Sequence, residues 1–334
     1  MDGGSEEELQ PDSTAPRPAS SVISFQAAEF PWWLVAMVAI IVAMATLVVV
    51  NDEYRQAFKS ILPWPASWTK GLALTLVLTI GSFFAATFLG LFIALARLAT
   101  YNGRRWYRPV LFLGAPAAVT ALILFAGTVT ATSASVLAIM WMVGILASWK
   151  QGVAVVIIRN TATLYIEFVR GIPMLVFIFA IALVIVPDFV NLLDIESRAV
   201  SQAWRGAAAL SLFYAAFIAE VFRAGIQSVP GGQIEAGRSV GLTEGQIMRK
   251  ITLPQAVRNM LPALGNDLIS LMKDTSLVSV LAVNELTQMA RLYSGSTFRF
   301  REAFFVLAIL YVTLTLVLSL ILRWYERRIS IPGD

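Results

Sequence analysis

Cysteine and histidine are both absent from the sequence. Their absence excludes disulfides, thiol nucleophiles, imidazole bases and the usual zinc sites together, so we expect no catalytic residue and no metal site. Charge is also scarce, because Asp, Glu, Lys and Arg make up 14% of the 334 residues, against 58% that are hydrophobic. A soluble domain carries about 25% charged residues. Most apolar side chains must therefore face lipid, which indicates an integral membrane protein.

The apolar residues are gathered into runs near the roughly 20 residues that cross a bilayer as an α-helix. These runs predict an all-α membrane protein with about eight transmembrane helices. The run at 134–149 is short for a span and is also compatible with a re-entrant segment. The predicted spans are residues 31–50, 71–96, 109–128, 134–149, 172–187, 207–222, 265–283 and 303–322.

The N-terminal segment, residues 1–30, is acidic and contains few large apolar side chains, which predicts a disordered tail. It lacks the basic start of a cleavable signal peptide, so we expect a retained anchor helix and an outer loop over residues 31–70. With both termini in the cytoplasm, Lys and Arg favour the inner segments by roughly two to one, as insertion requires. This orientation explains the net charge of +4, so no nucleic-acid partner is expected.

The polar stretch at residues 228–262 falls in the cytoplasm in this orientation. Thr243 can cap a helix, Gln246 can complete a capping box, and Gly241 can form a turn. Pro254 is expected to end the second helix. The stretch therefore predicts a helix, a glycine turn and a helix. Its apolar side chains suit docking into a groove of a partner, and an amphipathic pair lying on the lipid interface is equally compatible.

The order of residues in this stretch resembles the EAA coupling loop of ABC importer permeases. A Glu-Ala-Gly triplet is followed, at that family's spacing, by Gly and then by Ile-x-Leu-Pro. The one departure is Gly237, where the pattern has a second Ala. The resemblance implies that the loop docks on an ATPase subunit and transmits its motion to the transmembrane helices. The matching residues are Glu235, Ala236, Gly237, Gly241, Ile251, Leu253 and Pro254.

The resemblance extends over most of residues 71–328 and is closest to the polar amino acid branch, whose members import histidine, glutamine, glutamate, arginine or opines. It rests on YxExxRGIP from Tyr165, AEVFRAG from Ala219, PQA from Pro254 and KDTSL from Lys273. It implies a permease domain at 71–328 with the five-helix type I core. The chain departs from this compact form in the anchor helix at 31–50 and in an extra apolar insertion at 109–158. The coupling loop falls at 228–262 and a C-terminal tail at 329–334.

The resemblance also implies the partners. These are ABC ATPase subunits, a periplasmic or lipid-tethered amino-acid-binding protein, a second permease chain that is identical or paralogous, and a polar amino acid substrate, all at the bacterial inner membrane. ATP and Mg²⁺ would be bound by the ATPase, so no cofactor is expected on this chain. Residues 232–239 come close to a phosphate-binding loop, but Arg238 replaces the required Lys and no buried strand precedes it.

Ionisable residues inside a predicted span are the candidates for the substrate pathway, because charge in the bilayer is costly. Lys273 and Asp274 lie about nine residues into the span 265–283, beside Thr275 and Ser276. Our hypothesis is that Asp274 and Thr275 line the pathway. The alternative is an internal Lys–Asp pair or contacts that only join helices.

Two further charged pairs have the i, i+3 spacing that places both side chains on one helix face. Glu220 and Arg223 are predicted to pair near the cytoplasmic end of their helix, where they are also candidates for the pathway. Glu167 and Arg170 precede Pro173, which suits the first turn of a helix, so we expect these three residues to act in positioning or gating.

The competing interpretation is an ion-coupled secondary amino acid transporter that acts without an ATPase. Such proteins usually contain two similar halves with interrupted helices, and no convincing repeat is found in this sequence. Co-purification of an ATPase subunit would distinguish the two interpretations.

Overall fold

The computed structural model describes residues 32–55, 65–98, 151–194 and 196–329, and every regular element in these ranges is a helix. The expected all-α membrane fold is therefore confirmed for the part of the chain that the structure describes. Six of the eight predicted spans fall on described helices. The predicted spans 109–128 and 134–149 and the predicted tails lie outside the described residues.

The first helix, α2 (Trp32–Val50), forms a structural unit separate from the residues that follow Asp52. Its 19 residues are nearly all apolar, and several of its large side chains are exposed, including Val42 and Val50. An apolar surface of this kind suits lipid rather than water. A helix is therefore present where the anchor was predicted, over all of its described residues, 32–50.

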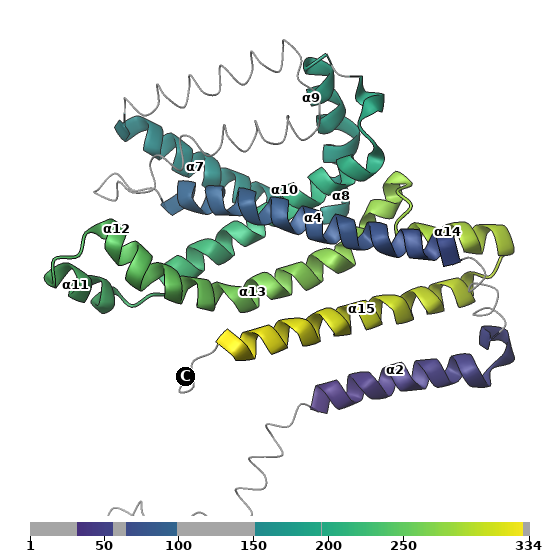
Figure 1. The fold of residues 1–334 in the computed structure, drawn as a ribbon. Helices are drawn as coiled ribbons and strands as arrows, with labels where there is room; N and C mark the ends of the chain where they lie inside the picture. The colour runs from purple at the N-terminus through teal and green to yellow at the C-terminus, as the bar shows by residue number, and fades with distance from the viewer. Residues whose placement is uncertain (1–31, 56–64, 99–150, 195, 330–334) are drawn as a thin grey trace, which may run out of the picture. The chain divides into compact units, whose positions relative to one another are not determined.

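The remaining helices form the second unit, and Figure 1 shows how they lie. Four candidate spans of sufficient length and apolar character occur among the described residues, at Trp68–Leu98, Met174–Leu192, Gln202–Gln227 and Phe300–Glu326. The second of them contains a π-helical turn between two α-helical segments. The elements are α4 (Pro65–Leu98), α7 (Gln151–Arg170), α8 (Met174–Phe179), η1 (Ala180–Ile185), α9 (Val186–Leu192), the short η2 (Ser197–Ala199), α10 (Gln202–Gln227), α13 (Leu253–Asp274), η4 (Thr275–Leu281), α14 (Leu286–Thr297) and α15 (Phe300–Ile329).

Helix α10 is the centre of this unit, because it packs on α4, α7, α13 and the α8–η1 segment. Its buried face is rich in alanine, and Ala209, Ala215 and Ala216 are fully buried. Small residues let helix backbones approach closely in a membrane protein. On α4, a Cβ at Gly90 would lie 2.9 Å from the Ile218 side chain, so glycine is required for this contact. The close α4–α10 pair is the scaffold on which the charged cluster described below is built.

Helix α13 differs from the prediction in two ways. The predicted span at 265–283 is wrong in its bounds, because the helix begins at Leu253 and its α-helical part ends at Asp274. Pro254 therefore lies at the second residue of α13, directly after the π-helical turn η3, and does not end a helix. The first half of α13 is amphipathic, so a search for continuous apolar runs found only its second half.

The end of the bundle near α14 is organised by a buried carboxylate. Glu285 is fully buried and caps α14 by accepting hydrogen bonds from the backbone N–H groups of Thr287 (2.9 Å) and Gln288 (2.8 Å). The Tyr311 hydroxyl on α15 donates to the same carboxylate over 3.1 Å. Capping satisfies N–H groups that the helix itself leaves unpaired. Glu285 therefore joins α14 to α15 and has a structural role that the sequence analysis did not identify.

Candidate functional site

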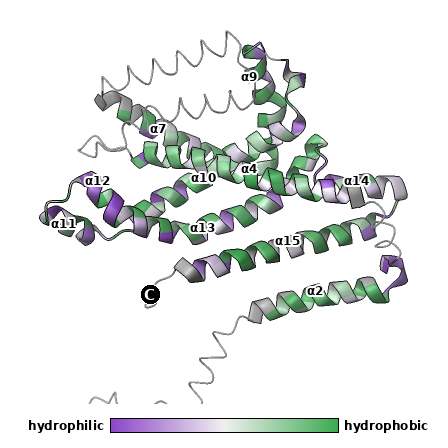
Figure 2. Ribbon diagram, in the orientation of Figure 1, coloured by the Kyte–Doolittle hydropathy of each residue, from purple (hydrophilic) through white to green (hydrophobic). Residues whose placement is uncertain are grey.

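The predicted helix–turn–helix lies between α10 and α13 and is rich in hydrophilic residues (Figure 2). It consists of α11 (Gly231–Ser239), α12 (Glu244–Ile247) and the π-helical turn η3 (Met248–Thr252), which runs on into α13. The capping box is confirmed, because the Gln246 N–H donates to the Thr243 hydroxyl (3.4 Å) and the Thr243 N–H donates to the Gln246 side chain (2.9 Å). Gly241 has φ +79°, so the turn requires glycine.

The two arms of this loop pack on each other at Gly237, the position that departs from the family pattern. Gly237 is buried, and a Cβ there would lie 2.8 Å from Ile251 Cδ1 and 3.1 Å from Ile247 Cγ1. Both distances are shorter than ordinary van der Waals contact, so alanine would require these side chains to shift. Glycine therefore allows α11 to lie close against α12 and η3.

Polar contacts hold the loop together on its outer side. The Arg238 Nε donates to a Glu244 carboxylate oxygen over 2.7 Å, which joins α11 to α12. This ion pair raises the pKa of the Arg238 guanidinium above its ordinary value. The Gln255 side chain donates to the Gln233 side chain over 2.6 Å and joins α11 to α13. The loop is therefore a braced unit, attached to α13 at its base.

The face of the loop directed away from the bundle is exposed. Val240, at the tip, is 75% exposed, and Leu253 is 45% exposed. Glu235 and Ala236 are exposed on α11, and Pro254 is exposed at the start of α13, while Ile251 is half-buried. A braced element that exposes apolar side chains among charged ones suits docking onto a partner. The structure thus brings the predicted coupling residues together in one element.

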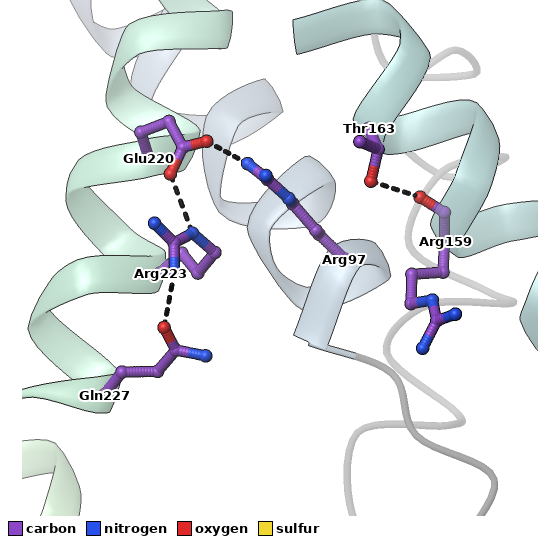
Figure 3. Close-up of polar contacts among 6 residues, drawn as sticks. All are labelled: Arg97, Arg159, Thr163, Glu220, Arg223 and Gln227. Atoms are coloured by element: carbon purple, nitrogen blue, oxygen red, sulfur yellow. Dashed lines mark hydrogen bonds and ion pairs between the residues drawn. The ribbon is translucent and has the colours of Figure 1, made fainter. Parts of the chain in front are cut away.

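A charged cluster lies where α4 and α10 end, on the side of the bundle that leads into the loop (Figure 3). The predicted Glu220–Arg223 pair is confirmed, with 2.7 Å between Arg223 Nε and the carboxylate. Arg97, from the last turn of α4, forms a second ion pair with the other oxygen of Glu220. The Arg223 guanidinium also donates to the Gln227 side chain. One carboxylate therefore holds two guanidinium groups and ties α4 to α10.

Arg170 lies close to this cluster, at the last residue of α7, but the structure records no ion pair between it and Glu167. Its guanidinium carbon lies 5.8 Å from the centre of the Phe217 ring on α10, in a cation–π arrangement. Pro173 is the N-cap residue of α8, just beyond the break that separates α7 from α8. Arg170 and Arg223 both line a pocket of about 570 Å³ at the ends of α10 and α13.

The residues predicted near the end of α13 are arranged around Asp274. The Tyr214 hydroxyl on α10 donates to its carboxylate over 2.6 Å, whereas no ion pair with the exposed Lys273 is recorded among the described residues. Ser276 is half-buried. Thr275 is fully buried, and its hydroxyl donates to the Met272 carbonyl over 2.7 Å. Asp274 is therefore the member of this group that keeps a carboxylate oxygen for another donor.

Asp267 is a second carboxylate on α13 that the sequence analysis missed. It is seven residues before Asp274, which places both on one helix face, and one of its oxygens is buried without a hydrogen-bond partner among the described residues. The i, i+7 spacing was visible in the sequence, and Asp267 lies inside the predicted span 265–283, but it lies at the start of that span and only the charges near its middle were selected. A buried carboxylate oxygen without a donor is a position where a cationic group of a ligand can bind.

A known protein family contains this arrangement of helices and loop. Residues 156–331 match the family described as "Binding-protein-dependent transport system inner membrane component". The chain belongs to this family. The match covers all of the coupling loop, α10 and α13 and identifies the chain as a permease subunit of an ABC importer, a multi-pass protein of the inner membrane. The fit of the loop residues to the EAA spacing remains a sequence resemblance.

Individual relatives agree with the family. "Probable amino-acid permease protein YxeN" of Bacillus subtilis (strain 168) is 39% identical over 176 residues, which cover 53% of this chain and 76% of that protein. "Glutamine transport system permease protein GlnP" of Escherichia coli (strain K12) is 36% identical over 191 residues, 57% of this chain and 84% of that protein. "Probable amino-acid ABC transporter permease protein YckA" of Bacillus subtilis (strain 168) is 33% identical over 242 residues, 72% of this chain and 80% of that protein.

Solved structures show the same fold. A chain from "Crystal structure of an amino acid ABC transporter with histidines" is 28% identical with a TM-score of 0.59, over 81% of this chain and 98% of that chain. A chain of the MetNI methionine ABC transporter in an inward-facing conformation has a TM-score of 0.53 at 19% identity, over 80% and 99% of the two chains, and supports the fold alone. The phosphate-loop resemblance at 232–239 has no structural basis, because these residues form the helix α11.

Proposed function

We propose that this chain forms the translocation pathway of an ABC importer for polar amino acids and couples it, through α11 and α12, to ATPase subunits. Family membership supports a transport subunit, and the relatives named as amino-acid and glutamine permeases favour the substrate class. The observation that carries the proposal is the braced loop with its exposed tip at Val240. An ion-coupled transporter has no need for such a docking element.

The proposed assembly contains this chain, a second permease chain that is identical or paralogous, two ATPase subunits and a periplasmic or lipid-tethered amino-acid-binding protein. ATP and Mg²⁺ bind to the ATPase subunits, and no reaction is assigned to this chain. Both termini and the loop at 228–262 lie in the cytoplasm, and residues 71–328 form the permease domain with the insertion at 109–158. Membrane lipid surrounds the apolar faces.

In the proposed mechanism, closure of the ATPase subunits on ATP moves α11 and α12, and the movement passes directly into α13. The path is short, because η3 continues into α13 without a break and Gln255 bonds back to Gln233. Rigid packing transmits such a displacement as a rearrangement of whole helices. Asp274 and Asp267 on α13 would then change their exposure to the two sides of the membrane.

The proposed substrate contacts use these carboxylates. An amino acid carries an ammonium group, which a buried carboxylate can bind by a charge-assisted hydrogen bond. Asp274 is positioned for this role by the Tyr214 hydroxyl, and Asp267 has a free oxygen among the described contacts. The Arg97–Glu220–Arg223 cluster is proposed to hold the loop-side ends of α4 and α10 together as the pathway changes conformation.

The test is transport by the reconstituted complex. The chain is assembled with its ATPase, permease and binding-protein partners in proteoliposomes, and uptake of labelled glutamine, arginine and histidine is measured together with ATP hydrolysis. We expect uptake of at least one of them to require ATP and the binding protein. We expect Glu235→Lys to reduce the amount transported per ATP hydrolysed, and the matched charge change Glu326→Lys, on α15, to leave this ratio unchanged. Uptake driven by an ion gradient without ATP would refute the proposal.

A further inference from the structure

The pocket at the ends of α10 and α13 has the properties of a small-molecule site. Its volume of about 570 Å³ falls within the range of about 300–1,000 Å³ that is typical of ligand pockets. Its walls combine apolar backbone and side-chain surface from α10 and α13 with a small set of polar groups. The polar lining residues are Arg170, Glu220, Arg223, Ser228 and Asn259.

The charge of this pocket is positive. Glu220, the one carboxylate among the described residues of its lining, is already held by both Arg97 and Arg223, so it cannot balance a further cation. Arg170 has no carboxylate partner among the described residues. The described lining therefore carries two guanidinium groups and one carboxylate that Arg97 also holds, and an anionic group would restore the balance.

Arg170 is held in a way that leaves its hydrogen-bond donors available. Its guanidinium carbon lies 5.8 Å from the centre of the Phe217 ring, and no hydrogen bond from this group is recorded among the described residues. The N–H donors of a guanidinium point outward in its plane, in a fork that fits the two oxygens of a carboxylate. The cation–π contact with Phe217 also restricts the Arg170 side chain, so less conformational entropy is lost when an acceptor binds.

The pocket is also lined by two neutral polar residues that are hydrogen-bonded to each other. The Asn259 side chain on α13 donates to the Ser228 hydroxyl over 2.8 Å, and this hydroxyl donates to the Gly225 carbonyl over 2.8 Å. This pair adjoins the start of the coupling loop, since Ser228 follows directly after α10. The pocket is thus placed between the helix ends and the element that docks on the ATPase.

We propose that this pocket binds the carboxylate group of a free amino acid on the cytoplasmic side, with Arg170 as the main ligand and Arg223 as a second positive charge. The inference rests on the proposed function and adds a second contact point to it, separate from the carboxylates of α13. It has a functional consequence. Because a cytoplasmic amino acid occupies a site beside the coupling loop, its accumulation slows further transport.

The experiment uses the complete complex in proteoliposomes, with the binding protein and labelled amino acid inside and ATP outside. Only complexes whose ATPase subunits face outward are then energised, so the external solution is the cytoplasmic side. L-Glutamine and L-arginine are added outside at increasing concentration, and the rate of ATP-driven export from the lumen is measured. Their methyl esters, which lack the carboxylate, are the ligand controls. Each variant is compared with its own rate without external amino acid.

We expect external glutamine or arginine to slow transport by the unsubstituted complex and the methyl esters to have little effect. Arg170→Gln should raise the half-inhibitory concentration about tenfold, because a charge-assisted hydrogen bond is lost. The half-inhibitory concentration of the Arg170→Lys complex should lie between those of the unsubstituted and Arg170→Gln complexes, since lysine keeps the charge but not the fork of donors. Arg159→Gln is the matched control, because it removes one positive charge from the same helix at an exposed position outside the pocket, and it should leave the inhibition unchanged.

The outcomes that would overturn the inference can be told apart from those that would overturn the proposed function. Equal inhibition of the Arg170→Gln and Arg159→Gln complexes, or no inhibition at all, would overturn the inference while leaving the proposed function intact. Arg170→Gln could instead change the transport rate only in vesicles that contain phosphatidylglycerol besides phosphatidylcholine, whatever amino acid is added. That result would assign the pocket to a lipid phosphate and would also overturn the inference. A failure of the unsubstituted complex to transport with ATP would overturn the proposed function and the inference together.

Discussion

The turn at Gly241 offers a sharp test of the coupling loop, because its cost can be worked out from the backbone alone. Gly241 has φ +79°, and a Cβ added there would have no other group within 4 Å, so Gly241→Ala adds strain without adding a clash. Placing an L-residue in the left-handed region costs roughly 1–2 kcal/mol. A cost of this size reduces the population of the turn relative to its alternatives by about 5- to 30-fold.

The same loop contains the matched control. Gly245 lies in α12, also with nothing within 4 Å, but without a positive φ. Alanine is favoured over glycine in a helix by about 1 kcal/mol, so Gly245→Ala should stabilise the loop slightly. The two substitutions add the same methyl group four residues apart, and they differ only in the backbone conformation that receives it.

Two measurements detect the lower population of the turn. Hydrogen exchange over residues 231–252 should become faster in the Gly241→Ala complex and equal or slower in the Gly245→Ala complex. The amount of amino acid transported per ATP hydrolysed should fall only in the Gly241→Ala complex. If both variants show the same exchange and the same transport ratio, the turn does not set the geometry of coupling, and the reasoning is wrong.

Three further predictions concern the ion pairs and the pathway. Arg238→Glu should lower the amount transported per ATP hydrolysed. Adding Glu244→Arg should restore it, because the ion pair between α11 and α12 is then re-formed with the charges exchanged. If the double variant does not restore the ratio, this ion pair does not support coupling. Glu220→Gln should lower the melting temperature of the complex, since two guanidinium groups lose their carboxylate at a cost of about 1–3 kcal/mol. An unchanged melting temperature would show that these ion pairs do not stabilise the α4–α10 contact. Asp274→Asn should raise the KM for uptake about tenfold. Tyr214→Phe should raise the KM less, because it removes only the hydrogen bond that positions Asp274. An unchanged KM in both variants would show that Asp274 does not contact the substrate.

Local features of the coupling loop and of the end of α10 were predictable from the sequence. The capping box at Thr243, the turn at Gly241 and the Glu220–Arg223 pair each depend on residues within a few positions of one another, and all three are confirmed. Such contacts are fixed by backbone geometry, so spacing alone identifies them.

Contacts between distant segments were not predictable. Arg97 reaches Glu220 across 123 positions, and Tyr214 reaches Asp274 across 60, and no spacing rule links such residues. Their meeting depends on the close packing of α10 with α4 and α13.

The start of α13 was mispredicted for a different reason. Proline both stops helices and occupies their first turn, and the sequence around Pro254 does not by itself decide between the two positions. The helix runs from α12 through η3 into α13, so Pro254 lies where the π-helical turn meets α13 and does not stop the helix.

The central claim is that α11 and α12 dock on an ATPase subunit at the inner face of the membrane. The chain contains no cysteine, so Val240→Cys introduces a single reactive thiol at the exposed tip of the loop. The most direct measurement is labelling of this thiol by a membrane-impermeant maleimide, in intact cells and in inside-out vesicles, with and without the ATPase subunit. The account predicts labelling only in inside-out vesicles and protection when the ATPase is present. Labelling from outside in intact cells, or equal labelling with and without the ATPase, would contradict it.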